Sequence, residues 1–363
     1  MLDPRADLAR GYLMVGIVYM HMLFFYANTR ASPTDAIATL IQIKLMAAHV
    51  ACFFLLSGMG ARQLKRRSLP SLLTHSLMLI ALAAAVHGIA YWTGDFFHNP
   101  FYRWVSTLRQ FAKPLLTGTG QSGFVGWFFI VLAWTRVITW TIERGWRWFV
   151  PAIPAYALFI WAGVRISGVD NFMEWRNVPA AVLFFLIGMR IPRDWAVPHW
   201  LGVIGLPLSL AIGWFNRPGL FAQGPCLSCD LGFATRMYYG LYGEPVMLIA
   251  MELSLLMFVL WLAQITLAMR QARLFSFLGQ NSPQLLFLHG IVLAAIQPWL
   301  LPLLPPRESA VLLIGVLIGS VLFHAALLRL TLPILNAVMA ACFTAARWLI
   351  DSATAVTART SPR

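Results

Sequence analysis

Charged side chains are scarce in this chain of 363 residues: Asp, Glu, Lys and Arg together make up 11% of it, whereas hydrophobic residues make up 60%. Such a composition cannot supply the polar surface of a soluble globule. The apolar residues are spread evenly along the chain, which also excludes a soluble domain with a single anchor. We therefore predict an all-α, polytopic integral membrane protein, with about ten transmembrane helices around an internal cavity.

Several catalytic motifs are also missing. The sequence has no HExxH, no GxSxG, no Walker loop and no set of Cys and His at zinc spacing, so it does not support hydrolysis by a metal or a serine triad. Cysteine is rare, with four residues, of which Cys226 and Cys229 are the close pair. Without a second pair, they favour a loop disulfide or two plain thiols over a metal site. We expect no permanently bound cofactor and no metal.

Long apolar runs fill the chain instead, and about 20 apolar residues suffice for a helix to cross a bilayer. We expect the first run to be a retained helix, because no small-residue cleavage site follows it. Residues 331 to 350 form either an eleventh span or a helix along the interface. We expect a transmembrane domain over residues 1 to 350 and a disordered cytoplasmic tail over 351 to 363. The predicted spans are residues 8 to 27, 38 to 61, 70 to 93, 123 to 143, 148 to 165, 178 to 191, 199 to 215, 244 to 269, 284 to 304 and 310 to 329.

The net charge is +14 at pH 7, from 27 Lys and Arg against 13 Asp and Glu. These cations lie in short clusters between the apolar runs, as topology signals do, so nucleic acid is not an expected partner. The densest cluster follows the second span, at residues 62 to 67. The positive-inside rule places this loop in the cytoplasm, and with it the amino terminus. Alternation then puts the clusters near residues 144, 190 and 270 on the same side.

Arg10 and His21 form the most informative pair in the chain. They are eleven residues apart in the first span. At 100° per residue they share one stripe of the helix, about 16 Å apart along its axis. Asp7 lies near the same stripe and is placed to pair with the guanidinium, since a desolvated charge requires a partner. An imidazole within the membrane is by default a candidate functional site, so we predict a site at His21.

Other polar side chains lie at matching depths in neighbouring spans. Lys44 and His49 of the second span are close to the level of His21, which suggests a shared cavity. The alternatives are that Lys44 extends to the outer headgroups and that His49 bonds a backbone carbonyl. His289, near the inner end of the ninth span, either borders the same cavity or packs in the core.

The FFLLSG run at the inner end of the second span combines two bulky aromatic residues with two small ones, which let a ligand or another backbone approach closely. It directly precedes the basic loop, whose cations could hold a phosphate-bearing ligand with its acyl end directed inward. The alternatives are helix packing for the small residues and a topology signal for the charges. The predicted donor site comprises Phe53, Phe54, Ser57, Gly58, Arg62, Lys65, Arg66 and Arg67.

Four segments together carry a resemblance to a known family. They are DLARG with Arg10 and His21, FFLLSGM from Phe53 to Met59, WFFIVL from Trp127, and LGQNSPQLLFLHG from Leu278 to Gly290. In this order they resemble the membrane acyltransferase-3 superfamily, which includes bacterial O-acetyltransferases of surface polysaccharides and succinyltransferases of periplasmic glucans. Pro283 and Leu286 depart from the family pattern, which favours a Tyr before its Leu and His. The stretch from residue 331 onward matches no motif.

The resemblance implies an O-acyltransferase of the bacterial inner membrane. Its donor would be a cytoplasmic acyl-CoA, with acetyl-CoA as the leading candidate. The acyl group would be acetyl or succinyl. Its acceptor would be a hydroxyl of an extracytoplasmic glycan or lipid-linked sugar. By carry-over, His21 is the catalytic histidine, Arg10 its companion at the cytoplasmic end, and residues 53 to 58 belong to the donor path. A neutral imidazole would take a proton from the hydroxyl or become acylated itself, and Lys44 is a candidate to stabilise the negative charge that develops.

Two other functions are compatible with the residues. A proton-coupled transporter or flippase for a glycan or lipid precursor would use His21, His49, Lys44 and Glu252 as a relay. A scaffold or regulatory membrane subunit would need none of them. The sequence does not specify the acyl group, the acceptor or the oligomeric state.

Overall fold

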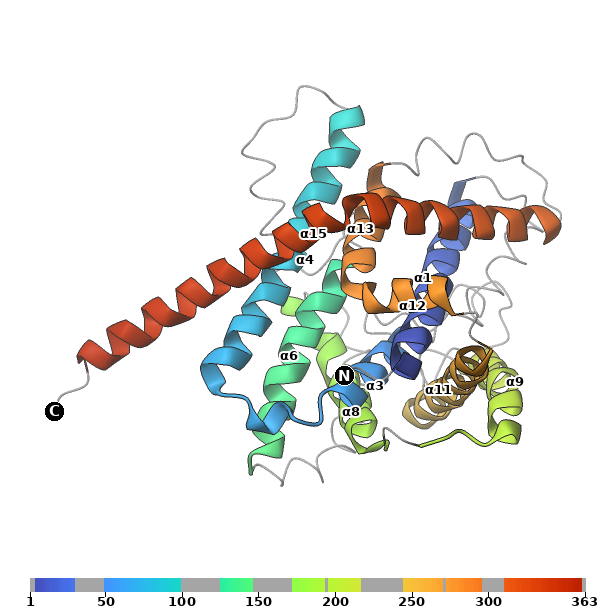
Figure 1. The fold of residues 1–363 in the computed structure, drawn as a ribbon, viewed down its shortest axis with the longest axis horizontal. Helices are drawn as coiled ribbons and strands as arrows, with labels where there is room; N and C mark the ends of the chain where they lie inside the picture. The colour runs from blue at the N-terminus through green and yellow to red at the C-terminus, as the bar shows by residue number, and fades with distance from the viewer. Residues whose placement is uncertain are drawn as a thin grey trace, which may run out of the picture.

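The computed structural model describes residues 4–29, 49–98, 125–145, 172–192, 195–216, 244–269, 272–295 and 310–360. Within these ranges the regular structure is helical, with no strand, as the composition predicts (Figure 1). The elements are α1 (Pro4–Thr29), α3 (His49–Gly60), η1 (Leu64–Arg66), α4 (Leu69–His98), α6 (Gly126–Glu143), η4 (Phe172–Asn177), α8 (Val178–Arg190), α9 (His199–Phe215), α11 (Pro245–Ala268), α12 (Arg273–Gln280), α13 (Ser282–Ala295) and α15 (Ala310–Thr360).

Nine of the ten predicted spans coincide with these helices, fully or in part, and the span predicted over residues 148 to 165 lies outside the described residues. By length and apolar composition, three stretches of the described helices are able to cross a membrane: Leu69–Ala90, Pro245–Ala268 and Ile318–Ala355. Shorter apolar helices are Val50–Gly60, His199–Phe215 and Ser282–Leu293. The chain is thus a helical membrane protein, while the number of ten crossings and the internal cavity stay predictions.

Small residues let helices α3 and α8 cross at a very short distance. A Cβ atom added at Gly58 of α3 would lie 2.1 Å from the carbonyl oxygen of Phe185 in α8, and one added at Gly188 would lie 2.0 Å from that of Leu55. Close approach of this kind is how helices associate in lipid, where no hydrophobic force pushes them together. The small residues of FFLLSG and FFLIG therefore position α3 against α8.

Aromatic side chains fill the space between α3 and α6. Phe54 is fully buried, and its ring centroid lies 4.8 Å from that of Phe128 and 6.5 Å from that of Trp127. Phe53 makes an edge-on contact with Phe128, with the centroids 6.0 Å apart. Such tilted and edge-on arrangements suit the quadrupoles of aromatic rings. The FFLLSG and WFFIVL runs thus form one packed core beside α1.

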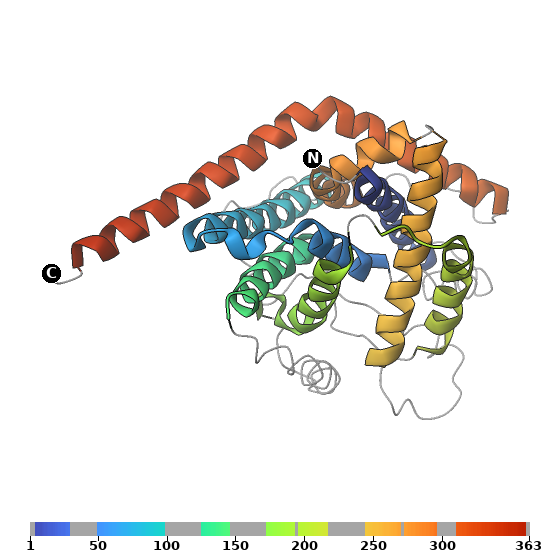
Figure 2. The same cartoon turned by 60° about the horizontal axis from the view of Figure 1, so that its bottom comes forward.

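The last helix, α15, is a single helix of 51 residues that packs across α4 and α13 (Figure 1). Residues 331 to 350, for which the sequence left two alternatives, continue the tenth predicted span without a break. Residues 351 to 360, expected to be disordered, form the last turns of the same helix. Figure 2 shows the helix changing direction part-way along its length. Pro333 lies inside it, lacks a backbone N–H and accounts for a bend.

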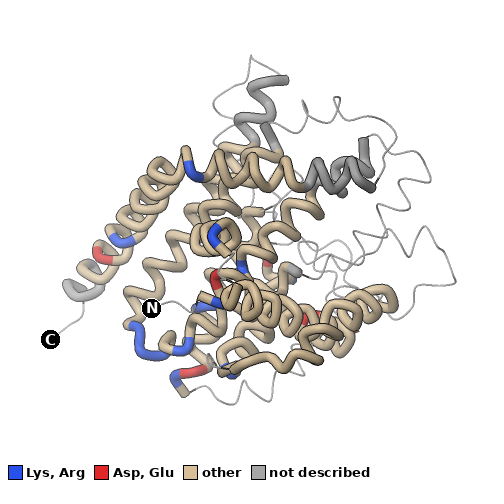
Figure 3. Tube along the Cα trace, turned by 45° about the vertical axis from the view of Figure 1, so that its right-hand side comes forward, with Lys and Arg blue, Asp and Glu red and all other residues tan. Residues whose placement is uncertain are grey.

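Basic residues gather at the end of the molecule where the amino terminus lies (Figure 3). Arg144 donates a hydrogen bond from Nε to the carbonyl oxygen of Lys65 at 3.2 Å, and Trp140 donates one to that of Arg67 at 3.0 Å. Arg190 pairs with Glu143 at 2.8 Å. The clusters near residues 62 to 67, 144 and 190, which the sequence assigns to one side of the membrane, are therefore neighbours in space.

Candidate active site

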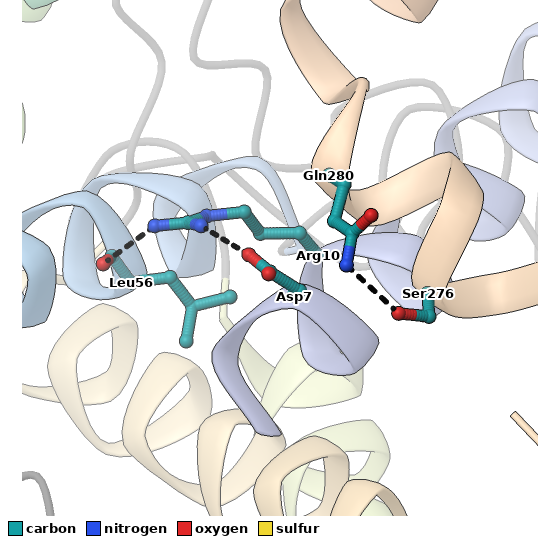
Figure 4. A network of polar contacts seen from close by, with 5 residues as sticks. All are labelled: Asp7, Arg10, Leu56, Ser276 and Gln280. Atoms are coloured by element: carbon teal, nitrogen blue, oxygen red, sulfur yellow. Dashed lines mark hydrogen bonds and ion pairs between the residues drawn. The ribbon is translucent and has the colours of Figure 1, made fainter. Parts of the chain in front are cut away.

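Arg10 is held between α1 and α3 (Figure 4). Its Nη1 donates to Oδ1 of Asp7, one turn earlier in α1, at 3.0 Å, and its Nη2 donates to the carbonyl oxygen of Leu56 in α3 at 3.4 Å. The side chains of Arg10 and Asp7 are only 18% and 5% exposed. The ion pair that the three-residue spacing predicts is thus present, and it fixes the guanidinium against Leu56 of the FFLLSG run.

A second crossing supports this part of α1 from the other side. A Cβ atom at Gly279 of α12 would meet the carbonyl oxygen of Asp7 at 1.7 Å, and one at Gly11 would meet that of Phe275 at 2.0 Å. Figure 4 shows Ser276 and Gln280 of α12 on the opposite side of Asp7 and Arg10 from Leu56, with Gln280 bonded to Ser276 at 3.3 Å. The LGQNS segment therefore acts as a support for the turn of α1 that carries the ion pair.

His21 lies further along α1 and meets two other histidines. Its Nδ1 is 2.8 Å from Nε2 of His289 in α13, and the two rings are stacked with centroids 5.0 Å apart. Nδ1 of His289 is 3.0 Å from Nε2 of His324 in α15, whose own Nδ1 is 2.8 Å from the carbonyl oxygen of Ser320. His289 and His324 are 0% and 4% exposed, whereas His21 is only partly buried.

The three imidazoles form a line rather than a metal site. His289 uses its two nitrogens for two different histidines, so the three rings do not converge on one point as metal ligands must. Among the described residues, no group of three or more His, Cys, Asp or Glu is arranged to hold a metal ion. Hydrogen bonding therefore accounts for the contacts among these rings.

The predicted donor residues occupy two environments. Phe53, Phe54 and Gly58 are buried in the packing described above, and Ser57 is partly buried. In the basic loop, Lys65, Arg66 and Arg67 are exposed, and Arg62 is partly buried. Nε of Arg62 is buried and has no hydrogen-bond partner among the described residues. Their role in binding a donor stays a prediction.

Arg10 lies close to both the FFLLSG run of α3 and the start of the basic loop. A Cβ atom added at Gly60, the last residue of α3, would lie 3.6 Å from Nη2 of Arg10, and the basic loop begins directly after Gly60. The basic loop therefore begins next to the Arg10–Asp7 ion pair of α1, the helix that also carries His21. Arg10 itself bonds Asp7 and Leu56, while His21 bonds His289, so the two predicted catalytic residues belong to separate clusters.

Two residues of the predicted cavity fall outside what the structure describes. Lys44 lies outside the described residues, and His49 is the first residue of α3 but its side chain is not described.

Glu252 of α11, considered as part of a proton relay, accepts a hydrogen bond from the thiol of Cys52 at 3.2 Å, with both residues fully buried.

His324 is the site residue that the sequence analysis missed. It lies 35 residues after His289 in an apolar run, and no spacing rule relates positions on two different helices. The available signal was its chemistry, because an imidazole in a membrane helix requires a polar partner. That rule marks His324 as noteworthy but does not identify the partner.

Comparison with known proteins gives one match. A family model described as an acyltransferase domain, of the acyltransferase-3 type, matches residues 3–325, a range that includes His21, His289 and His324. No curated protein and no solved structure matches the chain significantly.

Proposed function

Because the chain belongs to the acyltransferase-3 family and is a membrane acyltransferase, we propose that it transfers an acyl group, acetyl or succinyl, from cytoplasmic acyl-CoA to a hydroxyl on the outer side of the bacterial inner membrane. The acceptor is a glycan or a lipid-linked sugar. His21 is the base, or the group that is acylated and passes the acyl group on.

The contact between His21 and His289 carries this proposal. A partly buried imidazole whose Nδ1 is bonded to a fully buried imidazole at 2.8 Å is held in one orientation. Orientation by a third group is the arrangement that activates a histidine in nucleophilic catalysis. His199, in contrast, accepts a hydrogen bond from Trp261 in an exposed position and does not contact this group of histidines.

As a base, His21 would accept one proton from the acceptor hydroxyl and give one proton to the CoA thiolate. His21 takes the proton of the acceptor hydroxyl as its oxygen attacks the thioester carbonyl, and the carbon–sulfur bond then breaks. The proton passes from His21 to the departing thiolate, so the products are an ester and free CoA. If His21 is acylated first, its nitrogen attacks the thioester carbonyl, the carbon–sulfur bond breaks and the CoA thiolate leaves. The hydroxyl oxygen then attacks the acyl-imidazole, the bond to nitrogen breaks, and the hydroxyl proton neutralises the thiolate, so the products are the same.

The cations of the basic loop are suited to bind the phosphates of an acyl-CoA donor. CoA carries phosphates, and the exposed Lys65, Arg66 and Arg67 are charged groups of the kind that bind phosphate oxygens. Arg10, paired with Asp7, lies on α1 between this loop and His21. A donor bound at the loop would direct its acyl end past Arg10 and into the interior of the protein.

Purified protein in proteoliposomes tests the proposal. With labelled acetyl-CoA and succinyl-CoA, we expect the wild type to release CoA thiol or to transfer label to an acceptor, and we expect His21→Ala to release none above background. The matched control is His199→Ala, which removes a histidine that bonds Trp261 away from this cluster and should retain activity. Equal rates for wild type and His21→Ala would contradict the assignment of His21.

A proton-coupled transporter or flippase is the second candidate, and the line of three histidines favours it, since such lines also conduct protons. The same proteoliposomes distinguish the two. Uptake of a glycan or lipid precursor driven by a pH gradient, without release of CoA, would support transport and contradict acyl transfer.

A further inference from the structure

The carbonyl oxygen of Ser320 determines where the protons lie in the histidine line. A carbonyl oxygen only accepts hydrogen bonds, so Nδ1 of His324, 2.8 Å away, carries the hydrogen of that ring. A neutral imidazole has one N–H, which leaves Nε2 of His324 as an acceptor. His289 must therefore donate to it from its own Nδ1, 3.0 Å away.

The same logic extends to His21. Since the hydrogen of His289 is on Nδ1, its Nε2 accepts the bond from Nδ1–H of His21 at 2.8 Å. Nε2 of His21 then carries the lone pair. Burial supports neutral rings in this line, because His289 and His324 are 0% and 4% exposed and an isolated charge costs much free energy in such surroundings.

We propose that His324 is a positioning residue for the reaction: through His289, it holds His21 in the tautomer whose Nε2 is the reactive nitrogen. This inference rests on the proposed function and deepens it, because it names the nitrogen that meets the hydroxyl or the thioester. The wrong tautomer would place a hydrogen on Nε2 and remove the lone pair that both variants of the chemistry require.

Helix α15 is thereby part of the active site. Ser320 and His324 are one turn apart in α15, so this helix supplies both the acceptor that fixes the tautomer and the ring that transmits it. His289 comes from α13 and His21 from α1, so the line ties three helices together.

Two substitutions of similar size separate a tautomer effect from a packing effect. His324→Gln places an amide at the level of the former Nε2, where its oxygen accepts the bond from His289. His324→Asn is one carbon shorter, so its amide lies at the level of the former Nδ1 and offers no acceptor to His289. Both replace a buried ring by a neutral amide, and both are expected to fold.

Nitrogen-15 NMR of histidine-labelled protein in nanodiscs reads the tautomers directly, with His21→Ala used to assign the His21 signals. We expect the hydrogen of His21 on Nδ1 in the wild type and in His324→Gln, and on Nε2, at least in part, in His324→Asn. A wild-type His21 with its hydrogen on Nε2, or a tautomer unchanged in His324→Asn, would overturn the inference.

Kinetics provide the second measurement. We expect His324→Asn to lower kcat by at least about tenfold, as wrong-tautomer variants of other enzymes do, with little change in the KM for the donor, and His324→Gln to restore most of the loss. Equal loss in both variants would indicate a structural role and contradict the inference. If the wild type transfers no acyl group while the NMR result holds, the proposed function fails and the tautomer assignment stands.

Discussion

Arg10 shows how much a single charged side chain can contribute in a largely apolar helix. Its guanidinium bonds a carboxylate of its own helix and a carbonyl of the neighbouring one, so it both neutralises Asp7 and ties α1 to α3. A charge so little exposed is tolerated because it is paired. The same cation lies between the basic loop and the turn of α1 that leads to His21. Its structural and catalytic contributions therefore need to be separated by experiment.

Arg10→Ala should lower both stability and activity. Removal of the guanidinium leaves the Asp7 carboxylate buried without its cation, which costs about 3 kcal/mol in comparable pairs. The double variant Asp7→Asn with Arg10→Gln removes both charges and should regain most of the thermal stability, measured as the unfolding midpoint in detergent. Activity of the double variant should stay low, because the donor thioester still lacks the Arg10 charge. Recovery of both properties together would contradict a catalytic role for Arg10.

Residue spacing within one helix was predictable, and contacts between helices were not. The i,i+3 relation gave the Asp7–Arg10 pair directly. The contact between Arg10 and Leu56, and the line from His21 through His289 to His324, depend on how helices far apart in sequence are assembled. The carbonyl acceptors in particular have no sequence signal, because every residue carries one.

At the scale of helices, the sequence motifs also serve to pack one helix against another, in addition to carrying candidate site residues. Gly58 and Gly188 meet at the crossing of α3 and α8, and Gly11 and Gly279 meet at the crossing of α1 and α12. Hydropathy located α1, α3 and α8 but not the short α12, and it left two alternatives for the small residues of FFLLSG: close approach of a ligand or packing of helices. For Gly58, the nearest atoms are the backbone of α8, which supports the packing alternative.

Gly58→Ala is expected to destabilise the protein by about 1–3 kcal/mol, the usual cost of a group forced into a packed interior. The new Cβ would lie 2.1 Å from a backbone oxygen that cannot move aside without separating the helices. Gly319→Ala in α15 is the matched control, since nothing lies within 4 Å of its added Cβ, and its unfolding midpoint should not fall. Loss of activity in Gly58→Ala at an unchanged midpoint would instead favour close approach of a ligand.

Helix boundaries were predicted less well than helix positions. The sequence divided the chain near residue 330 and again near 351, where polar residues and a proline interrupt the apolar run. The structure continues one helix from Ala310 to Thr360 through Pro333. Ile334, Trp348 and Leu349 remain 65%, 66% and 53% exposed along it, which suits a helix in contact with lipid rather than with water.

For the whole molecule, the clearest finding is that the charge pattern and the fold agree. Loop 62 to 67, Arg144 and Arg190 are separated in sequence, yet they lie together at the end of the molecule that holds the amino terminus (Figure 3). The positive-inside rule predicts that this end faces the cytoplasm. The donor would then enter beside Arg10, and the acceptor would approach His21 from the opposite side.

Gln63→Cys tests this orientation. Gln63 is exposed in the basic loop, between α3 and η1. A membrane-impermeant maleimide should label the variant in inside-out vesicles and leave it unlabelled in intact spheroplasts, with the wild type as the baseline for the native cysteines. Labelling in spheroplasts would place the basic loop outside and reverse the proposed direction of transfer.

The most direct test of acyl transfer by His21 is mass spectrometry of surface glycans and of extracted lipid-linked sugars. The samples come from cells that lack the gene, cells that carry it, and cells that carry His21→Ala at equal protein level. We predict an ester-linked acetyl or succinyl group that is present only with the wild-type gene. The same acyl group at the same abundance in all three strains would contradict the account.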